Sequence, residues 1–199
     1  MNKVIEVYAE STPNPAALKF VTSRMLLGEG QVEYQNKQQA SVSPLASQLF
    51  DFSGVKSVFI TGNFITIVKD NDADWYELMP IFREFLKSFL SSGEKVFLSN
   101  PLSSSNGKTE IIKEENGQPV AEGAIESQIR SVLEEYVLPA VEQDGGHISF
   151  VSYDDGIVKV LLQGACSGCP SSTMTLKAGI ENLLTRMVPG VKEVVAVEG

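Results

Sequence analysis

Residues 148–170 read ISFVSYDDGIVKVLLQGACSGCP, and this stretch carries the local signals that decide the fold around it. Two runs rich in β-branched and aromatic residues, Ile148–Tyr153 and Ile157–Leu162, flank the turn-forming residues 154–156, Asp-Asp-Gly. An Asp-Gly pair between such runs is typical of a β-hairpin, because glycine readily adopts the positive φ of a tight turn. The stretch ends at Pro170, which suits the first position of a helix, where its missing N–H costs nothing. We therefore expect a hairpin, a short loop and then a helix.

The residues on both sides of this hairpin complete a small α+β unit. Apolar residues recur at three- and four-residue spacing before and after it, which predicts two helices that each bury one face. Pro139 should disrupt the first helix near its end, and the following Gly145 and Gly146 should terminate it. The second helix should end near Pro189, and Val191–Val197 should form a last strand. The apolar stripes comprise Ile125, Ile129, Val132, Leu133 and Tyr136 in the first helix, and Met174, Leu176, Ile180, Leu183, Leu184 and Met187 in the second.

The first half of the chain repeats the same kinds of signal in a different order. The expected elements are strands over Val4–Ala9 and Leu18–Val21, a short helix that opens at Ser43-Pro44, a hairpin of Val55–Thr61 with Phe64–Val68 across Gly62-Asn63, and a helix over residues 75–90. The last helix contains Pro80, which should kink it or mark its true start. Its apolar and aromatic stripe predicts packing against a core.

A polar segment separates the two halves. Residues 99–123 read SNPLSSSNGKTEIIKEENGQPVAEG, which is poor in apolar residues and rich in turn-forming and charged ones. Such a composition cannot bury enough apolar surface to order itself, so it predicts a flexible linker. We therefore predict an α+β protein of two small domains, over residues 1–98 and 123–199, joined by a linker over residues 99–122. Each domain should be a small sheet that contains a hairpin and is covered by helices.

Composition excludes several classes of function. The chain has 199 residues, 43% of them hydrophobic, and a formal net charge of −9. A negative protein has no general affinity for nucleic acid or for anionic membranes, so neither is an expected partner. No apolar run approaches the roughly 20 residues that span a bilayer. The N-terminal residues lack the features of a signal or transit peptide, so we expect a cytoplasmic location, where thiols stay reduced.

Cys166 and Cys169 form the one group of residues in the sequence that predicts a metal or redox site. Two residues between cysteines is a spacing at which both thiolates can bind one metal centre or close a small redox disulfide. Gly164 and Gly168 allow a tight turn close to a bulky ligand. Both sulfurs should lie near the N-terminus of the helix that starts at Pro170, where unpaired N–H groups favour thiolate over thiol. The hydroxyl groups nearby, which could donate hydrogen bonds to sulfide, belong to Ser171, Ser172 and Thr173.

Three interpretations of this pair remain open. A thiol–disulfide oxidoreductase would use the same spacing, although its proline usually lies between the cysteines. A structural zinc site needs four ligands, and the chain offers two cysteines and, at most, its single histidine, His147. An iron–sulfur cluster also needs about four thiolates, which two chains together would supply. A cluster held by two ligands per chain is easier to release than one fixed by four, which favours delivery over permanent electron transfer.

Two longer segments resemble a known family. Residues 125–197, with LPAVEQDGGHISFV, GACSGCPSSTMTLKAGIE and VPGVKEVVAV, resemble the C-terminal module of NifU-related iron–sulfur scaffolds, the Nfu-type domain. Residues 5–90, with STPNPAALKF and SPLASQLFDFSGVKSVFITGNFITIVK, resemble the N-terminal domain of two-domain Nfu proteins. The resemblance implies a non-enzymatic carrier of a transient cluster, [4Fe–4S] or [2Fe–2S], bridged between two protomers through Cys166 and Cys169. It further implies upstream cluster donors and apo-protein clients as partners.

Other polar residues are interpreted as structural. His147 follows Gly145-Gly146, at a position that differs among relatives, so we interpret it as a surface turn residue and not as a further ligand. Asp144, Asp154 and Asp155 stand in turn contexts, where aspartate bonds to nearby backbone. The sequence has no nucleophile-elbow or phosphate-binding motif, which leaves no signal for a catalytic site.

Overall fold

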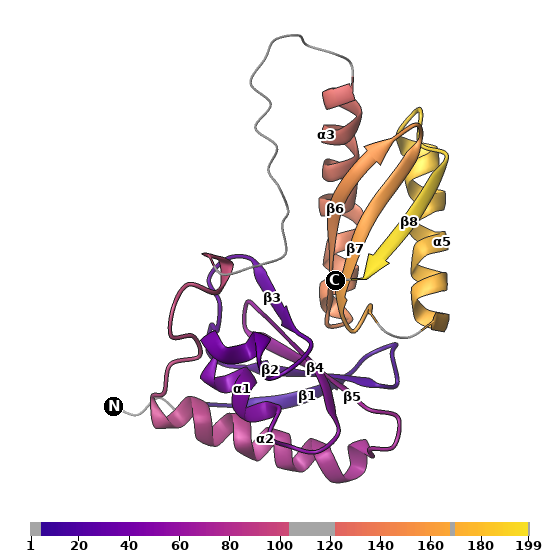
Figure 1. Cartoon of the computed structure of the whole chain (residues 1–199). Coiled ribbons are helices and arrows are strands. Elements are labelled where there is room, and N and C mark those ends of the chain that lie inside the picture. Colours follow the sequence, from indigo (N-terminus) through magenta and orange to yellow (C-terminus); the bar gives the residue numbers. More distant parts are fainter. Residues whose placement is uncertain (1–4, 104–121, 168–169, 199) are drawn as a thin grey trace.

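The computed structural model describes residues 5–103, 122–167 and 170–198, and these residues form two α+β units (Figure 1). The predicted fold class is thereby confirmed. Each unit has its own sheet and its own buried apolar cluster. The predicted linker falls mainly on residues 104–121, which lie outside the described residues, so the predicted boundaries stay a prediction. No helix in the described part of the chain is both long and apolar enough to cross a membrane.

The first unit is an antiparallel five-stranded sheet in the order β1-β2-β5-β4-β3. Its helices lie on one face, and the second unit lies on the other side of the sheet (Figure 1). The strands are β1 (Val7–Ser11), β2 (Ala17–Thr22), β3 (Gln31–Tyr34), β4 (Val55–Thr61) and β5 (Phe64–Lys69), and the α-helices are α1 (Pro44–Leu49) and α2 (Trp75–Ser92).

The helix ends follow from capping chemistry. Ser43 caps α1 by accepting a hydrogen bond from the Ala46 N–H at 3.2 Å, with Pro44 at the first helical position as predicted. Asp74 caps α2 in the same way, so that helix begins well before Pro80, which does not mark its start. Gly93 ends α2 in the left-handed conformation, with φ of 83°.

The second unit is a three-stranded sheet in the order β6-β7-β8. The predicted hairpin of β6 (Gly146–Asp154) with β7 (Ile157–Gly164) is confirmed, and its turn has φ of 43° at Asp155 and 87° at Gly156. Helix α5 (Pro170–Met187) then crosses over to β8 (Glu193–Glu198), which pairs in parallel with β7.

The helix that precedes β6 shows how the chain accommodates Pro139. It consists of α3 (Glu122–Val132), a single π turn η3 (Leu133–Val137) and α4 (Leu138–Gln143). Proline has no N–H and its ring collides with the carbonyl four residues earlier in a regular helix. The π turn, in which the Leu138 N–H bonds to the Leu133 carbonyl, widens the helix just before the proline.

The sequence signals missed the weakest elements. Strand β3 and two 3₁₀ turns, η1 (Gln39–Val42) and η2 (Pro101–Ser103), were not expected. The first strand starts at Val7, later than predicted. By contrast, the aromatic stripe of α2 packs into the core as expected, because Phe82, Leu86, Phe89 and Leu90 are buried.

Candidate metal centre

Close-packed backbone surrounds Cys166, the first of the two predicted ligands. Cys166 lies in the turn after β7 and its exposed fraction is 8%. A Cβ atom at Gly146 would collide with the Cys166 sulfur, and one at Gly164 would lie 2.7 Å from the Gly145 carbonyl. Gly164 also has φ of +65°. Glycine at these positions therefore lets the start of β6 and the end of β7 approach the cysteine.

The Cys166 loop is tied to the helix that follows it. The Thr173 hydroxyl donates a hydrogen bond to the Cys166 carbonyl at 3.2 Å, which joins the loop to the first turn of α5. The predicted position ahead of a helix is therefore confirmed for Cys166. Cys169 and the side chains of Ser171 and Ser172 lie outside the described residues. Of the two predicted ligands, the structure therefore describes only Cys166.

A cavity of about 60 Å³ lies beside Cys166. Its lining comes from both units of the chain: Pro13 belongs to the first, and Val141, Asp144, Ala165, Cys166 and Leu176 to the second. A space of this size holds a few water molecules. It is too small for the four irons and four sulfides of a cubane cluster together with a second pair of cysteines.

Burial makes Cys166 a neutral thiol in this arrangement. The pKa of Cys166 is raised to about 12, mainly by burial, and the negative charges of Asp144 and Glu33 contribute to the same shift. The expectation that the helix N-terminus would favour thiolate is therefore wrong for Cys166 as it lies here. Desolvation opposes the charged form, and no positive charge in the described residues lowers the pKa of Cys166 again.

His147 does not lie in a surface turn, which corrects the sequence interpretation. It belongs to β6, opposite Gln163, and its side chain is only 13% exposed. Its Nδ1 lies 3.7 Å from Glu142 Oε1, too far for a hydrogen bond. Burial lowers the pKa of His147, so the imidazole is neutral and this contact is no ion pair.

The three aspartates behave as turn residues, with one addition. Asp154 ends β6 and Asp155 occupies the hairpin turn, where it also pairs with Lys192 at 3.2 Å. Asp144 is the C-cap of α4, and it is the acidic residue of this unit whose charge raises the pKa of Cys166. The predicted turn contexts are confirmed for all three, and Asp144 has this further effect on the pKa of the cysteine.

Comparison with known proteins connects both units to one family. The family model described as "Scaffold protein Nfu/NifU N terminal" matches residues 7–93, and the one described as "NifU-like domain" matches residues 129–195. The chain belongs to the two-domain Nfu/NifU iron–sulfur cluster scaffold family. The predicted resemblance is confirmed over both parts of the chain, so we call them the Nfu N-terminal domain and the NifU-like domain.

The chain is similar to several individual proteins. The chain is 38% identical over 190 residues to NifU-like protein 4, mitochondrial, of Arabidopsis thaliana, covering 94% of this chain and 64% of the relative. It is 36% identical over 189 residues to the NFU1 iron-sulfur cluster scaffold homolog, mitochondrial, of Drosophila willistoni, covering 94% and 62%. It thus spans slightly less than two thirds of these relatives. A solution structure of a NifU-like protein from Saccharomyces cerevisiae is 31% identical, with a TM-score of 0.45, and covers 50% of this chain and 92% of its own.

Sequence reasoning missed two residues of the Nfu N-terminal domain that reach the Cys166 loop. Asn14 donates from Nδ2 to the carbonyls of Ala165 and Ser167, both at 3.1 Å. Glu33 accepts from the Ser167 hydroxyl at 3.5 Å and from the Gly164 N–H. Asn14 carried a signal only for extended backbone before a proline, and Glu33 stands in a strand that the sequence did not indicate.

Glu33 should make the stability of this protein depend on pH. Burial raises the pKa of Glu33 to about 7, although hydrogen bonds from Gly164, Ser57 and Ser167 oppose the shift. The unfolded carboxyl titrates near 4.5, so the folded state loses stability as pH rises from there to about 7. We expect Glu33→Gln to raise the free energy of unfolding at pH 8 by about 1–2 kcal/mol, after allowance for residual exposure.

The measurement is urea unfolding of the full chain and of the variant at pH 5 and pH 8. The rise in the free energy of unfolding caused by Glu33→Gln should be several times smaller at pH 5. At that pH the buried Glu33 is still protonated in the folded state, so most of the cost of ionising it has not yet appeared. Gains of equal size at both pH values would assign the effect to packing and not to the charge. Glu94→Gln, on an exposed residue, is the matched control and should change stability by less than about 0.5 kcal/mol.

Proposed function

We propose that this chain is an iron–sulfur cluster carrier that binds a transient cluster through Cys166 and Cys169 of two protomers and transfers it to apo-proteins. The family supports a scaffold role. The observation that carries the finer proposal is the placement of Cys166, in a glycine-bounded turn directly ahead of α5, with Cys169 as the one other cysteine in the sequence.

The number of ligands leads to the two-protomer arrangement. Iron–sulfur clusters of the [4Fe–4S] and [2Fe–2S] types are held by about four cysteine thiolates, and each chain offers two. We propose the [4Fe–4S] form as the main cargo and the [2Fe–2S] form as the alternative, since two chains supply the four thiolates that either form needs. The proposed unit is therefore a homodimer when loaded, with residues 123–199 as the cluster-binding domain and residues 1–98 as the second domain.

Transfer follows from the same incomplete set of ligands. Each chain contributes half of the thiolates, so an incoming apo-protein can replace one protomer's pair at a time without leaving the cluster bare. This is ligand exchange, so the proposed role is binding and delivery and not catalysis. The partners are cluster donors and apo-protein clients, with neither nucleic acid nor membrane among them.

The proposed compartment is a reducing one, since both thiols must stay free. The cytoplasmic location expected from the sequence finds no support among the relatives, two of which are named as mitochondrial proteins. We therefore propose only the redox condition and no particular organelle.

Anaerobic reconstitution tests the proposal directly. The full chain, incubated with ferrous iron, sulfide and a thiol reductant, should take up about four irons and four sulfides per two chains, and its solution mass should double. Iron and sulfide analysis gives the stoichiometry, and size-exclusion chromatography with light scattering gives the mass. A cluster bound by a single chain would contradict the bridged arrangement.

The same preparations separate the proposal from its two alternatives. A thiol–disulfide oxidoreductase would show reversible formation of a Cys166–Cys169 disulfide at a defined potential and no iron in protein isolated without oxygen. A zinc-stabilised interaction protein would be isolated with zinc and without labile sulfide. Either result would replace the carrier proposal.

A further inference from the structure

The Nfu N-terminal domain has a sheet face that its own helices do not cover. Side chains alternate along each strand, and those on one face, such as Phe20, Ile60 and Ile65, pack under α1 and α2. The opposite face, which we call the docking face, contains Ala17, Lys19, Glu33, Ser57, Phe59, Thr61, Thr66 and Val68. Lys19 is 8% exposed and Thr66 is 0% exposed, although both are polar and no helix of their own domain lies over them. The NifU-like domain lies over this side of the sheet (Figure 1), and both side chains donate hydrogen bonds to it.

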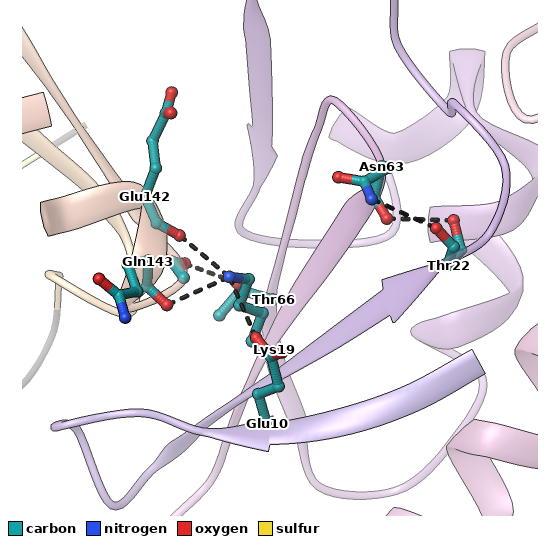
Figure 2. Close-up of polar contacts among 8 residues, drawn as sticks. Glu10, Lys19, Thr22, Asn63, Thr66, Glu142 and Gln143 are labelled. Atoms are coloured by element: carbon teal, nitrogen blue, oxygen red, sulfur yellow. Dashed lines mark hydrogen bonds and ion pairs between the residues drawn. The ribbon is translucent and has the colours of Figure 1, made fainter. Parts of the chain in front are cut away.

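Lys19 and Thr66 bind the end of helix α4 and the turn after it (Figure 2). Lys19 Nζ donates to the carbonyls of Glu142 and Gln143 at 3.2 and 3.1 Å. These carbonyls end a helix, where a positive charge is favourable, and the Glu142 carbonyl also accepts from the Gly145 N–H at 3.1 Å. The Thr66 hydroxyl donates to the Gly145 carbonyl, immediately before β6.

Asn14 holds the cysteine loop itself. Its Nδ2 bonds to the carbonyls of Ala165 and Ser167, the two residues that flank Cys166. Its Oδ1 accepts from the Ala16 N–H at 2.9 Å, which fixes the orientation of the amide, and the side chain is 1% exposed. The amide therefore fits this loop specifically and is not a general surface contact.

Apolar contacts continue the same interface. Ala165 packs with Ala17 and Val68 of the docking face in one buried cluster. A Cβ at Gly164 would meet the Phe59 ring at 3.0 Å, so the glycine sits directly against that ring. Polar and apolar contacts thus converge on Gly164, Ala165 and Ser167, the residues next to the proposed ligand Cys166.

We propose that the docking face is an intramolecular receptor for the Cys166 loop, and that this closed arrangement excludes a second copy of the chain until the two domains separate. This inference rests on the proposed function, because the excluded partner is the second protomer of the cluster-bridged dimer. Cys166 is nearly buried, and the cavity beside it has a volume of about 60 Å³ and is bounded by Pro13 of the Nfu N-terminal domain. The same loop therefore cannot contact the docking face and a partner's cysteines at once.

The contacts between the two domains can break without disrupting either domain. Most are hydrogen bonds to main-chain carbonyls, which water replaces when the domains separate, so their net contribution is modest. Interfaces between domains of one chain commonly permit relative motion. Residues 104–121 join the two domains, and a chain of that length can span up to about 60 Å. Separation therefore requires no unfolding of either domain.

Alkylation of Cys166 in reduced, iron-free full-length protein tests the closed state. Iodoacetamide modification is followed by mass spectrometry of the peptide, which distinguishes Cys166 from Cys169. Thr66→Val and Lys19→Met each remove a donor to the NifU-like domain while they keep the side-chain size. Each should raise the rate of Cys166 alkylation by about tenfold, the change expected when a buried bond between the domains is lost.

Thr61→Val is the matched control. Thr61 lies on the docking face and its hydroxyl donates to the Gly30 carbonyl at 2.8 Å, within the same domain. This variant should leave the alkylation rate unchanged. The proposal is overturned if Thr66→Val, Lys19→Met and their double variant all alkylate at the wild-type rate. It is equally overturned if Thr61→Val accelerates the reaction as much as Thr66→Val does.

A second measurement keeps this inference distinct from the proposed function. The docking variants should take up a cluster several times faster than the wild type, with the same final iron content per chain. Alkylation involves no iron, so it reports on docking even in a chain that binds no cluster. A fast-alkylating variant without any cluster uptake would therefore refute the carrier function and leave the docking inference standing.

Discussion

Cys166→Ser and Cys169→Ser should each lower the iron and sulfide content of reconstituted protein by roughly tenfold or more. A hydroxyl is a poor iron ligand beside a thiolate, and a bridged cluster would lose two of its four sulfur ligands, one from each chain. Iron and sulfide analysis after anaerobic desalting measures the loss. Circular dichroism and thermal unfolding show whether the apo variants keep the wild-type fold.

Two controls sharpen this result. Met174→Ser changes an exposed side chain at the start of α5, 72% exposed, and should keep wild-type cluster content. A tagged Cys166→Ser, Cys169→Ser double variant mixed with untagged wild type should recover no cluster-bound wild type on the tag, because a bridged cluster needs thiolates from both chains. If the single cysteine variants keep the full cluster content, Cys166 and Cys169 are not the cluster ligands.

Phe82→Ala should lower the free energy of unfolding of the Nfu N-terminal domain by about 3–5 kcal/mol, the usual range for a buried aromatic residue. Phe82 is 0% exposed. Its ring packs edge-on against Phe20, Phe52 and Trp75, with centroids 6.2, 5.5 and 6.2 Å away. Removal leaves a cavity where α2 meets the sheet, and packed neighbours collapse only partly into such a space.

Denaturant unfolding of the full chain, followed by fluorescence of the single tryptophan Trp75, measures the loss in this domain. Ile81→Ala provides the comparison on the same helix, because Ile81 is 46% exposed and its loss should cost no more than about 1 kcal/mol. A similar loss for both variants would mean that α2 is held by its whole surface and not by the aromatic stripe.

Local signals predicted most elements because they act between neighbours in the sequence. The hairpin turn at residues 154–156 requires positive φ, and Ser43 with Pro44 caps and opens α1. Strand β3 (Gln31–Tyr34) was not predicted because it is short and is stabilised by pairing with β4. Its own residues therefore carry little local signal for a strand. His147 was misplaced for a related reason: the glycines before it suggest a turn, and pairing with Gln163 draws it into β6.

The sequence by itself determined the α+β character, the two sets of elements and the pair Cys166 and Cys169 as the one candidate for metal chemistry. Each of these depends on spacing and on residue type, which local sequence specifies. The tertiary structure decided the state of Cys166: a buried neutral thiol, with its flanking carbonyls held by Asn14 and its charge opposed by Glu33 and Asp144. Asp144 lies nearby in the chain, but Asn14 and Glu33 lie more than a hundred positions from the loop, and only folding brings them to it.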